Sequence, residues 1–190
     1  MNSYMTTPAI FLIGTLFDLY ILAVLLRFLL QYFGGDFYNP ISQFLIKATH
    51  PPLKVLRRFV PAIRRIDTAS LVLVFALQIV EDFSIRLLAG QMIGIAPQVI
   101  FSISHLMELF IDIFIYSVFA RALLSWFMPA GFDAASSILT SLTEPLLKTC
   151  RKFIPDMGGM DLSPLAALLL LQLAKMFILP PLHGLASLVS

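Results

Sequence analysis

Residues 49–70, THPPLKVLRRFVPAIRRIDTAS, and residues 143–164, TEPLLKTCRKFIPDMGGMDLSP, repeat one order of residue types. Each stretch starts with a threonine and continues through proline into a basic amphipathic run. A second proline follows, and then an aspartate. The two stretches start 94 residues apart, at Thr49 and Thr143. A short, very apolar chain that carries such a segment twice is predicted to contain a duplicated unit.

The same spacing of 94 residues relates most of the chain to itself without a gap. Asp18 corresponds to Asp112, and Arg27 corresponds to Arg121. Further polar matches are Lys54 with Lys148, Arg57 with Arg151, Arg58 with Lys152, Asp67 with Asp161 and Gln78 with Gln172. Apolar segments resemble one another by chance, but charged residues do not easily align in them that way. We therefore predict two repeats, residues 1–94 and 95–190, which share one orientation and are related by an axis along the membrane normal.

Composition predicts that the chain resides in a lipid bilayer. Hydrophobic residues make up 59% of the sequence and charged residues only 13%, whereas soluble domains carry about 25% charged residues. The mean hydropathy of +0.91 points the same way. A net charge of +2, without aromatic residues interleaved among the basic ones, argues against a nucleic-acid partner. The bilayer, with its anionic headgroups, is the first predicted partner.

The sequence carries no signature of an enzyme. It contains no nucleophile elbow, no phosphate-binding glycine loop and no HExxH motif. Its single cysteine, Cys150, cannot form an internal disulfide, and no Cys/His spacing is typical of a metal site. We therefore expect no catalytic residues, no metal and no cofactor.

Four segments are long and apolar enough to cross a bilayer, which takes about 20 helical residues. They cover residues 9–33, 70–88, 97–128 and 164–182. The second is the weakest, since the charged stretch EDFSIR lies in its last third. Asp82 and Arg86 are four residues apart there and predict a local ion pair. Between the spans, residues 40–60 and 134–154 predict two short basic amphipathic helices on the membrane surface.

The distribution of basic residues predicts the orientation. Six lie between residues 34 and 67 and three between residues 129 and 163, whereas the tails and the turn at residues 89–97 carry none outside the spans. The positive-inside rule therefore places both long connections in the cytoplasm and both termini outside. The predicted fold is an all-α membrane protein with four transmembrane helices in two parallel repeats, each with a cytoplasmic basic amphipathic surface helix.

Cations at the cytoplasmic ends of the spans are candidates for lipid or partner contacts. Arg27 and Arg121 lie close enough to this interface to reach lipid phosphates with their long side chains. The surface helices add Lys54, Arg57, Arg58, Lys148, Arg151 and Lys152. Each cation near anionic headgroups contributes about 1 kcal/mol to membrane binding. Docking of a cytoplasmic protein on the same basic faces is the alternative.

Four residues are predicted to serve helix starts. In DLSP of the second repeat, Ser163 is the expected N-cap and Pro164 the first helical residue of the last span. Asp67 and Asp161 then lie beside the positive end of a helix dipole, which favours a carboxylate. A structural role and a binding role both stay open for these aspartates.

Ionisable residues inside the predicted spans are functional candidates, because charge at bilayer depth is costly. Asp18 and Asp112 each stand nine residues before an arginine, about 13.5 Å along the helix and on its other side, so no cation of their own helix neutralises them. Glu81 and Lys175 correspond to each other in the two repeats. A cluster of Asp18, Asp112, Glu81 and Lys175 is therefore geometrically feasible.

One face of the third span carries further polar groups. His105, Glu108, Asp112 and Tyr116 follow one another at helical spacing. Such a stripe is compatible with interhelical pairing that holds the bundle together, with a path for protons or cations, or with a metal site. The sequence leaves all three interpretations open.

The paired segments ARALLSWF with TEPLLKTCRKFIPDMGGMDLSP, and LRFLLQYF with THPPLKVLRRFVPAIRRIDTAS, resemble the YggT (YGGT-repeat) family of bacterial inner-membrane proteins. The resemblance covers nearly the whole chain. The first repeat departs from the pattern, since IRRIDTAS stands where the second has MGGMDLSP, so a role of those glycines does not carry over to it. The resemblance implies a multi-pass inner-membrane protein. It also implies links to osmotic and salt stress in bacteria, and to cytochrome b6 maturation and nucleoid organisation in plastids.

Two functions follow as hypotheses. In the first, a non-enzymatic membrane protein organises or assists other membrane proteins through its cytoplasmic basic helices and supports the cell under osmotic stress. In the second, Asp18, Asp112 and Glu81 serve a cation or proton-coupled transport component. Four helices make a small pathway, so transport would require a homo-oligomer.

Overall fold

The computed structural model describes residues 3–64, 66–91, 94–127, 134–153 and 161–189. Apart from an isolated bridge between Ile63 and Ile66, these ranges contain helices and no β-structure. The helices are α1 (Ser3–Phe33), α2 (Pro40–Leu56), α3 (Thr68–Ala89), α4 (Ile95–Phe127), α5 (Ala134–Phe153) and α6 (Ser163–Val189). The predicted all-helical class is confirmed. The last helix continues through Pro180 and Pro181, beyond residue 182 where its span was expected to end.

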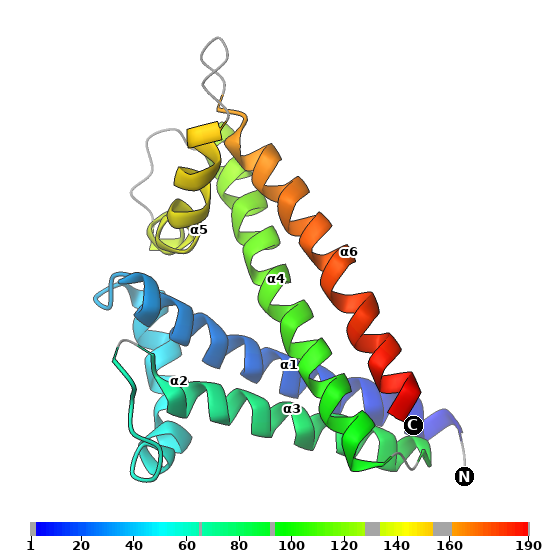
Figure 1. Cartoon of the computed structure of the whole chain (residues 1–190). Coiled ribbons are helices and arrows are strands. Elements are labelled where there is room, and N and C mark those ends of the chain that lie inside the picture. The colour runs from blue at the N-terminus through cyan, green and yellow to red at the C-terminus, as the bar shows by residue number, and fades with distance from the viewer. Residues whose placement is uncertain (1–2, 65, 92–93, 128–133, 154–160, 190) are drawn as a thin grey trace.

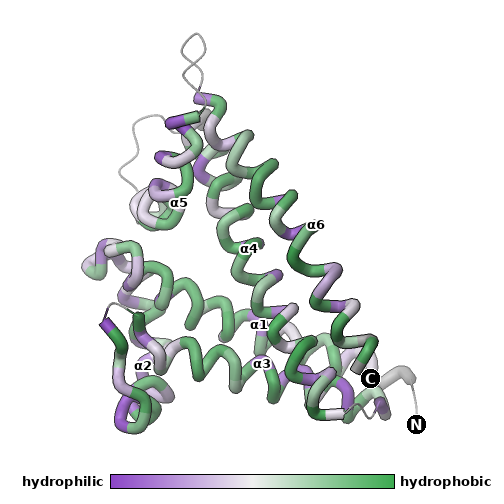
Figure 2. Tube along the Cα trace, in the orientation of Figure 1, coloured by the Kyte–Doolittle hydropathy of each residue, from purple (hydrophilic) through white to green (hydrophobic). Residues whose placement is uncertain are grey.

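In the part of the chain that the structure describes, three helices are long and apolar enough to cross a membrane. These segments are Thr6–Phe33 in α1, Ile95–Ser125 in α4 and Ser163–Ala186 in α6. The helix expected to be the weakest span, α3, is not among them. Large apolar side chains point outward from the long helices, as with Phe11 and Phe177, which are 73% and 76% exposed, and apolar residues follow the length of these helices (Figure 2). Such an outer surface is compatible with a membrane protein.

Helices α1 and α3, and likewise α4 and α6, pack together as antiparallel hairpins (Figure 1). The hairpins meet at the end of the molecule where α1 begins and α6 ends, and they diverge toward the opposite end (Figure 1). The short helices α2 and α5 both lie at this open end, each packed against the hairpin of its own half of the chain. We call the open end the α2/α5 end and the other one the termini end.

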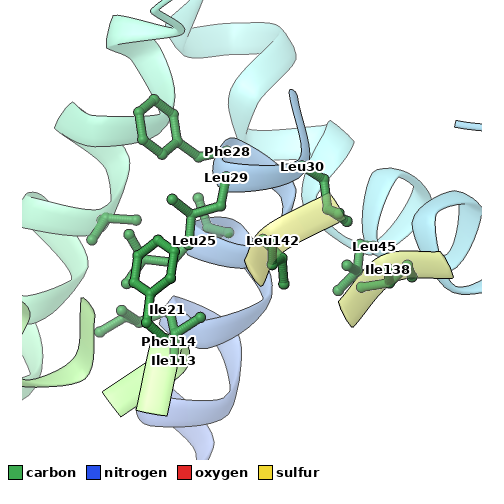
Figure 3. Packing of buried hydrophobic residues seen from close by; sticks show 12 residues of the cluster. Ile21, Leu25, Phe28, Leu29, Leu30, Leu45, Ile113, Phe114, Ile138 and Leu142 are labelled. Atoms are coloured by element: carbon green, nitrogen blue, oxygen red, sulfur yellow. The ribbon is translucent and has the colours of Figure 1, made fainter. Parts of the chain in front are cut away.

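Helix α1 is central to the packing, because it contacts α2, α3, α4 and α5. An apolar cluster joins these helices toward the α2/α5 end (Figure 3). Its buried members include Ile21, Leu25, Phe28 and Leu29 of α1, Leu45 of α2, Ile113 and Phe114 of α4, and Ile138 and Leu142 of α5. Close-packed side chains hold helices in one register and rotation, so this cluster sets which polar residues of the long helices face one another.

Local sequence sets the ends of the shorter elements. The Asn39 side chain accepts a hydrogen bond of 2.9 Å from the backbone N–H of Ile41, and Pro40 takes the first position of α2. Nδ2 of Asn39 also donates to the carbonyl of Ala134 at 2.7 Å, which ties the start of α2 to the start of α5. At the termini end, Gly90 ends α3 in the left-handed conformation with a φ of 71°.

Candidate functional site

Three charged side chains contact one another between α4 and α6. We call Lys175, Glu108 and Asp112 the Lys175 triad. Nζ of Lys175 donates to Oδ1 and Oδ2 of Asp112 at 2.7 and 2.9 Å, and it lies 3.0 Å from Oε1 of Glu108. Glu108 and Asp112 are one turn apart on α4, so one lysine of α6 reaches both. The triad joins the two helices of this hairpin through a cation that faces two carboxylates.

The equivalent place in the first half of the chain holds acids without a lysine. The corresponding residues, 94 positions apart, are Gly14 and Glu108, Asp18 and Asp112, and Glu81 and Lys175. Glu81 is 1% exposed, and the charge of Asp18 on α1 acts on it. Glu81 faces Gly14, where an added Cβ would lie 3.7 Å from its Oε1. The hairpin of α1 and α3 therefore carries two acids and no lysine here, whereas in the other hairpin one lysine binds two acids and leaves one net negative charge.

A polar network, the Gln78 network, links Glu81 to α4. Nε2 of Gln78 lies 3.3 Å from Oε2 of Glu81, 3.3 Å from Oδ1 of Asp82 and 2.9 Å from Nδ1 of His105. Asp82 accepts a hydrogen bond of 2.6 Å from the Ser102 hydroxyl, and its Oδ1 lies 3.6 Å from Nδ1 of His105. Because one amide carries only two hydrogens, Glu81 receives at most a shared, long hydrogen bond.

A pocket of about 190 Å³ lies beside this network. Its walls are Asp82, Phe101, His105, Glu108 and His183. Asp82 and His105 belong to the Gln78 network, and Glu108 belongs to the Lys175 triad. The pocket therefore adjoins both polar groups, which come from three different helices.

The structure divides the charged cluster that the sequence made feasible. Lys175 pairs with Asp112, whereas Glu81 faces Gly14 and the Gln78 network. The predicted ion pair of Asp82 and Arg86 is wrong. Asp82 instead contacts Gln78 of α3 and Ser102 and His105 of α4. The Arg86 guanidinium lies 4.7 Å from the ring centre of Phe101.

The predicted stripe on α4 is divided in the same way. His105 faces α3, whereas Glu108 and Asp112 face α6. Tyr116, the fourth member, is 69% exposed and belongs to neither group. Within the described ranges, no three His, Cys, Asp or Glu side chains are arranged to hold a metal ion.

Sequence reasoning missed Gln78 and Ser102 as members of the site. Gln78 stands three and four residues before Glu81 and Asp82, so all three share one face of α3. Ser102 stands three residues before His105 on α4. A helical projection of each segment would have shown these faces, but not that the two faces meet.

At the α2/α5 end, an arginine of each hairpin binds a threonine of the adjacent short helix. Nη1 of Arg27 donates to Oγ1 of Thr49 at 2.8 Å, and Nη1 of Arg121 donates to Oγ1 of Thr143 at the same distance. Glu144 adds a carboxylate that accepts from Nη2 of Arg121 at 2.7 Å, and this hydrogen bond lowers the pKa of Glu144. The two arginines, expected to reach lipid phosphates, thus hold the short helices against the long ones.

An ion pair of arginine and aspartate also occurs in both halves of the chain at this end. Arg57 binds Asp67, and Nη2 of Arg151 lies 2.9 Å from Oδ2 of Asp161. Burial acts to raise the pKa of Asp67, but hydrogen bonds from Arg57 and Ser70 outweigh it, so the pKa lies below its ordinary value. The pKa of Asp161 is also lowered, because hydrogen bonds from Ser163 and Arg151 outweigh the effect of burial.

Asp161 caps α6 in place of Ser163. Oδ1 of Asp161 accepts a hydrogen bond of 2.9 Å from the backbone N–H of Ser163. The Ser163 hydroxyl is buried and has no hydrogen-bond partner among the described residues. Pro164 follows as the second residue of the helix, where its missing N–H is tolerated. The predicted capping by the Ser163 side chain is therefore wrong.

Of the six cations predicted for the surface helices, four form no ion pair with any residue in the described part of the chain. They are Lys54, Arg58, Lys148 and Lys152, and all four are exposed. Phe59 and Phe153 are 78% and 81% exposed beside them. The α2/α5 end therefore presents basic and aromatic side chains together.

Comparison with known proteins shows a family. A family model described as CCB3/YggT matches the chain twice, over residues 6–88 and 100–182. The two matches start 94 residues apart (100 − 6 = 94), the same spacing that relates the two halves of the sequence. An uncharacterized protein of Pseudomonas aeruginosa is 40% identical over 177 residues, which are 92% of this chain and 90% of the relative.

Two further relatives extend the comparison. The uncharacterized protein YggT of Escherichia coli is 33% identical over 167 residues, which are 87% of this chain and 86% of that protein. The chloroplastic YlmG homolog protein 2 of Arabidopsis thaliana is 40% identical over 63 residues, 33% of this chain and 25% of that protein. No solved structure matches the chain. Because the two family matches and the bacterial relatives cover most of its length, the chain belongs to the CCB3/YggT family.

Proposed function

We propose that the chain is a multi-pass protein of the bacterial inner membrane with four transmembrane helices in two parallel repeats. Helix α3 is the fourth span in this proposal. It has 22 residues, which extend about 33 Å, it packs along α1, and a bilayer core is about 30 Å thick. The distribution of basic residues supports an α2/α5 end in the cytoplasm and both termini outside. Helices α2 and α5 then lie at the headgroups as surface helices.

In this membrane the protein acts as a proton or cation-coupled transport component, with Glu81 and Asp18 as its binding groups. The observation that carries this proposal is the burial of Glu81, which is 1% exposed and has no lysine or arginine partner among the described residues. An ionised carboxylate in an apolar medium without a counter-charge is strongly disfavoured. Glu81 is therefore expected to take up a proton or a small cation.

The groups around Glu81 support the same role. The titratable side chains that act on it are Asp18 of α1, Asp82 of its own helix and His105 of α4. None of them is permanently cationic, in contrast to the lysine that the other hairpin carries at the equivalent position. Asp112, expected to be a binding group as well, is neutralised by Lys175, and it is therefore left out of the proposed site.

On the side of the termini end, a pocket lies beside the Gln78 network, which contacts Glu81. The pocket beside the Gln78 network includes Phe101 and His183, which come from the ends of α4 and α6 that lie at the termini end. Toward the α2/α5 end, α1 continues with the buried apolar residues Ile21, Val24 and Leu25. This arrangement favours uptake of the proton or cation from the outside over passage through an open pore. Its release would be coupled to a conformational change or to a second copy of the chain.

Flux in reconstituted vesicles tests the proposal. An imposed proton, Na⁺ or K⁺ gradient is expected to drive flux through the wild-type protein, read with dyes enclosed in the vesicles. Glu81→Gln and Asp18→Asn are each expected to lower the initial rate to that of empty vesicles, because each removes a charge that the ion must meet. Asp36→Asn removes an exposed carboxylate outside the network and is expected to keep wild-type flux. Unchanged flux in Glu81→Gln, or none in the wild type at any pH, would contradict the proposal.

A second function is favoured by a different observation, the exposed cations and phenylalanines of the α2/α5 end. Through this surface the protein would organise or assist other membrane proteins and support tolerance of osmotic stress. The test replaces Lys54, Arg58, Lys148 and Lys152 together by glutamine and compares the proteins that co-purify from native membranes, and growth at high salt. Both are expected to be lost in the quadruple variant and kept in Asp36→Asn. Retention of partners and growth in the quadruple variant would contradict this function.

A further inference from the structure

Arg27 and Arg121 correspond in the two halves of the chain, but one neighbour differs. A shift of 94 residues places His50 of α2 where α5 has Glu144. Glu144 bridges two arginines, since its Oε2 accepts from Nη2 of Arg121 at 2.7 Å and its Oε1 accepts from Nη1 of Arg151 at 3.1 Å. A histidine cannot supply that negative charge, so the first half lacks the bridging anion.

Arg27 is consequently left with neutral acceptors. Its Nη1 donates to Oγ1 of Thr49 at 2.8 Å and to the carbonyl of Ile46 at 3.4 Å. In Arg121 the corresponding atom Nη2 donates to Glu144. Among the described residues, Nη2 of Arg27 makes no hydrogen bond, and no carboxylate lies within ion-pair distance of this arginine. Arg27 is only 7% exposed. A guanidinium held in a nearly buried place without a paired anion is costly, which points to an anion from outside the chain.

A charge count shows the same difference. In the first half, Arg27 and Arg57 carry +2 and Asp67 carries −1, which sums to +1. In the second half, Arg121 and Arg151 carry +2, and Glu144 and Asp161 carry −2, which sums to zero. His50 and Lys54 are exposed one turn apart on α2, so the position of the missing carboxylate lies at the protein surface.

We propose that the place between Arg27, His50 and Arg57 binds one phosphate-type anion, the phosphodiester of an anionic lipid headgroup, where the second half has the Glu144 carboxylate. Guanidinium groups match phosphate oxygens in charge and geometry.

The location of the site favours a lipid source. Arg27 stands six residues before the end of α1, about 9 Å along the helix. Tyr32, Tyr38 and Phe44 are 47%, 89% and 67% exposed near it, as is typical of aromatic residues at a membrane interface. The inference uses the proposed membrane architecture but not transport through Glu81, so a failure of the flux test leaves it standing, and the reverse is also true.

Exchange of His50 and Glu144 tests the site, because one variant should remove the lipid site of the first half and the other should create one in the second half. Full-length protein in a non-ionic detergent is titrated with phosphatidylglycerol or phosphatidylcholine, and bound lipid is counted by native mass spectrometry. The wild type is expected to retain one phosphatidylglycerol selectively. His50→Glu is expected to weaken this binding about tenfold or more, the size of one lost charge-assisted contact. Glu144→His is expected to bind a second phosphatidylglycerol.

Two controls separate a specific site from diffuse charge. Gln43→Glu adds a negative charge at another exposed position of α2 and is expected to keep wild-type affinity. An equal loss in Gln43→Glu and His50→Glu, or no loss in His50→Glu, would overturn the proposal. Inorganic phosphate is the second control. If phosphate alone raises the unfolding temperature of the wild type but not of His50→Glu, and phosphatidylglycerol binds no better than phosphatidylcholine, the ligand is a soluble anion and the lipid assignment fails.

Discussion

Lys175 of α6 donates to both carboxylate oxygens of Asp112 on α4, at 2.7 and 2.9 Å. Its counterpart in the first half of the chain is the buried acid Glu81, which stands near Asp18. The two hairpins therefore share a backbone plan but carry opposite charges at one equivalent position. This inversion leaves the acids of one hairpin paired with a lysine, whereas the acids of the other have no lysine or arginine partner among the described residues.

Removal of the lysine is expected to destabilise the protein. Lys175→Gln leaves Glu108 and Asp112 facing each other without a counter-charge. The Lys175 and Asp112 side chains are 21% and 24% exposed, so we expect a loss of about 1–3 kcal/mol in the free energy of unfolding, less than breaking a fully buried pair costs. Thermal unfolding in detergent measures it, with Lys148→Gln, an exposed and unpaired cation, as the control. Equal unfolding temperatures for the two variants would show that the triad does not stabilise the hairpin.

Exchange of the charges at positions 81 and 175 is expected to have opposite effects on the stability of the folded protein. Glu81→Lys supplies Asp18 with the cation that the second hairpin already has, so this variant is expected to fold with at least wild-type stability while losing ion flux. Lys175→Glu brings three carboxylates together and is expected to give little folded protein. Yield after size-exclusion chromatography and unfolding temperature report both outcomes. A Glu81→Lys variant that unfolds as readily as Lys175→Glu would show that Asp18 and Glu81 are not arranged like their counterparts.

Acid is expected to weaken the α2/α5 end through Asp67. Its pKa is lowered in the folded protein because hydrogen bonds from Arg57 and Ser70 outweigh burial. The unfolded state therefore binds the proton at a higher pH than the folded state does. The stability is fully present above the ordinary aspartate pKa of about 3.9 and is lost as the pH falls through the lowered folded pKa. The measurement is the unfolding temperature of the wild type and of Asp67→Asn from neutral pH downward. The two curves should converge in acid, and a constant difference between them at all pH values would rule out this linkage.

The two threonines that bind the arginines are expected to differ in importance. Thr49→Val removes the shortest hydrogen bond of Arg27, which among the described residues otherwise donates only to the Ile46 carbonyl, and we expect a cost of about 1–3 kcal/mol. Thr143→Val is expected to cost less, because Arg121 keeps Glu144. Valine has nearly the shape of threonine, so the pair of variants isolates the hydroxyl. Equal losses in unfolding free energy would argue that Glu144 does not compensate for Thr143.

Local properties of the chain were predictable. The helical class, the apolar helices and the basic amphipathic segments depend on composition and on periodicity within a few turns. The two shorter helices begin at Pro40 and Ala134, after which the amphipathic pattern starts. The ion pairs of Arg57 with Asp67 and of Arg151 with Asp161 were not predicted, because the sequence assigned the arginines to lipid or partner contacts and the aspartates to helix starts.

Partner choice among the charged residues was not predictable in the same way. The sequence made an ion pair of Asp82 and Arg86 reasonable, yet Ser102 and His105 of α4 bind Asp82. It also left the acids of the spans in one feasible cluster, whereas the structure separates the Lys175 triad from Glu81. The missed members, Gln78 and Ser102, are uncharged residues whose importance depends on the helix that lies opposite them.

The sequence by itself determined that this is an apolar, all-helical, duplicated chain of the CCB3/YggT family, because hydropathy, helical period and the 94-residue spacing are properties of the chain alone. Only the tertiary structure decided which acid meets a base and why Asp161 rather than Ser163 caps α6. It also decided that, among the described residues, Arg27 pairs with no carboxylate while Arg121 pairs with one. The physical reason is that such contacts depend on the rotation of each helix about its axis and on its depth against its neighbours. Packing of the buried side chains around α1 sets both of these, and the pattern within any single helix does not contain them.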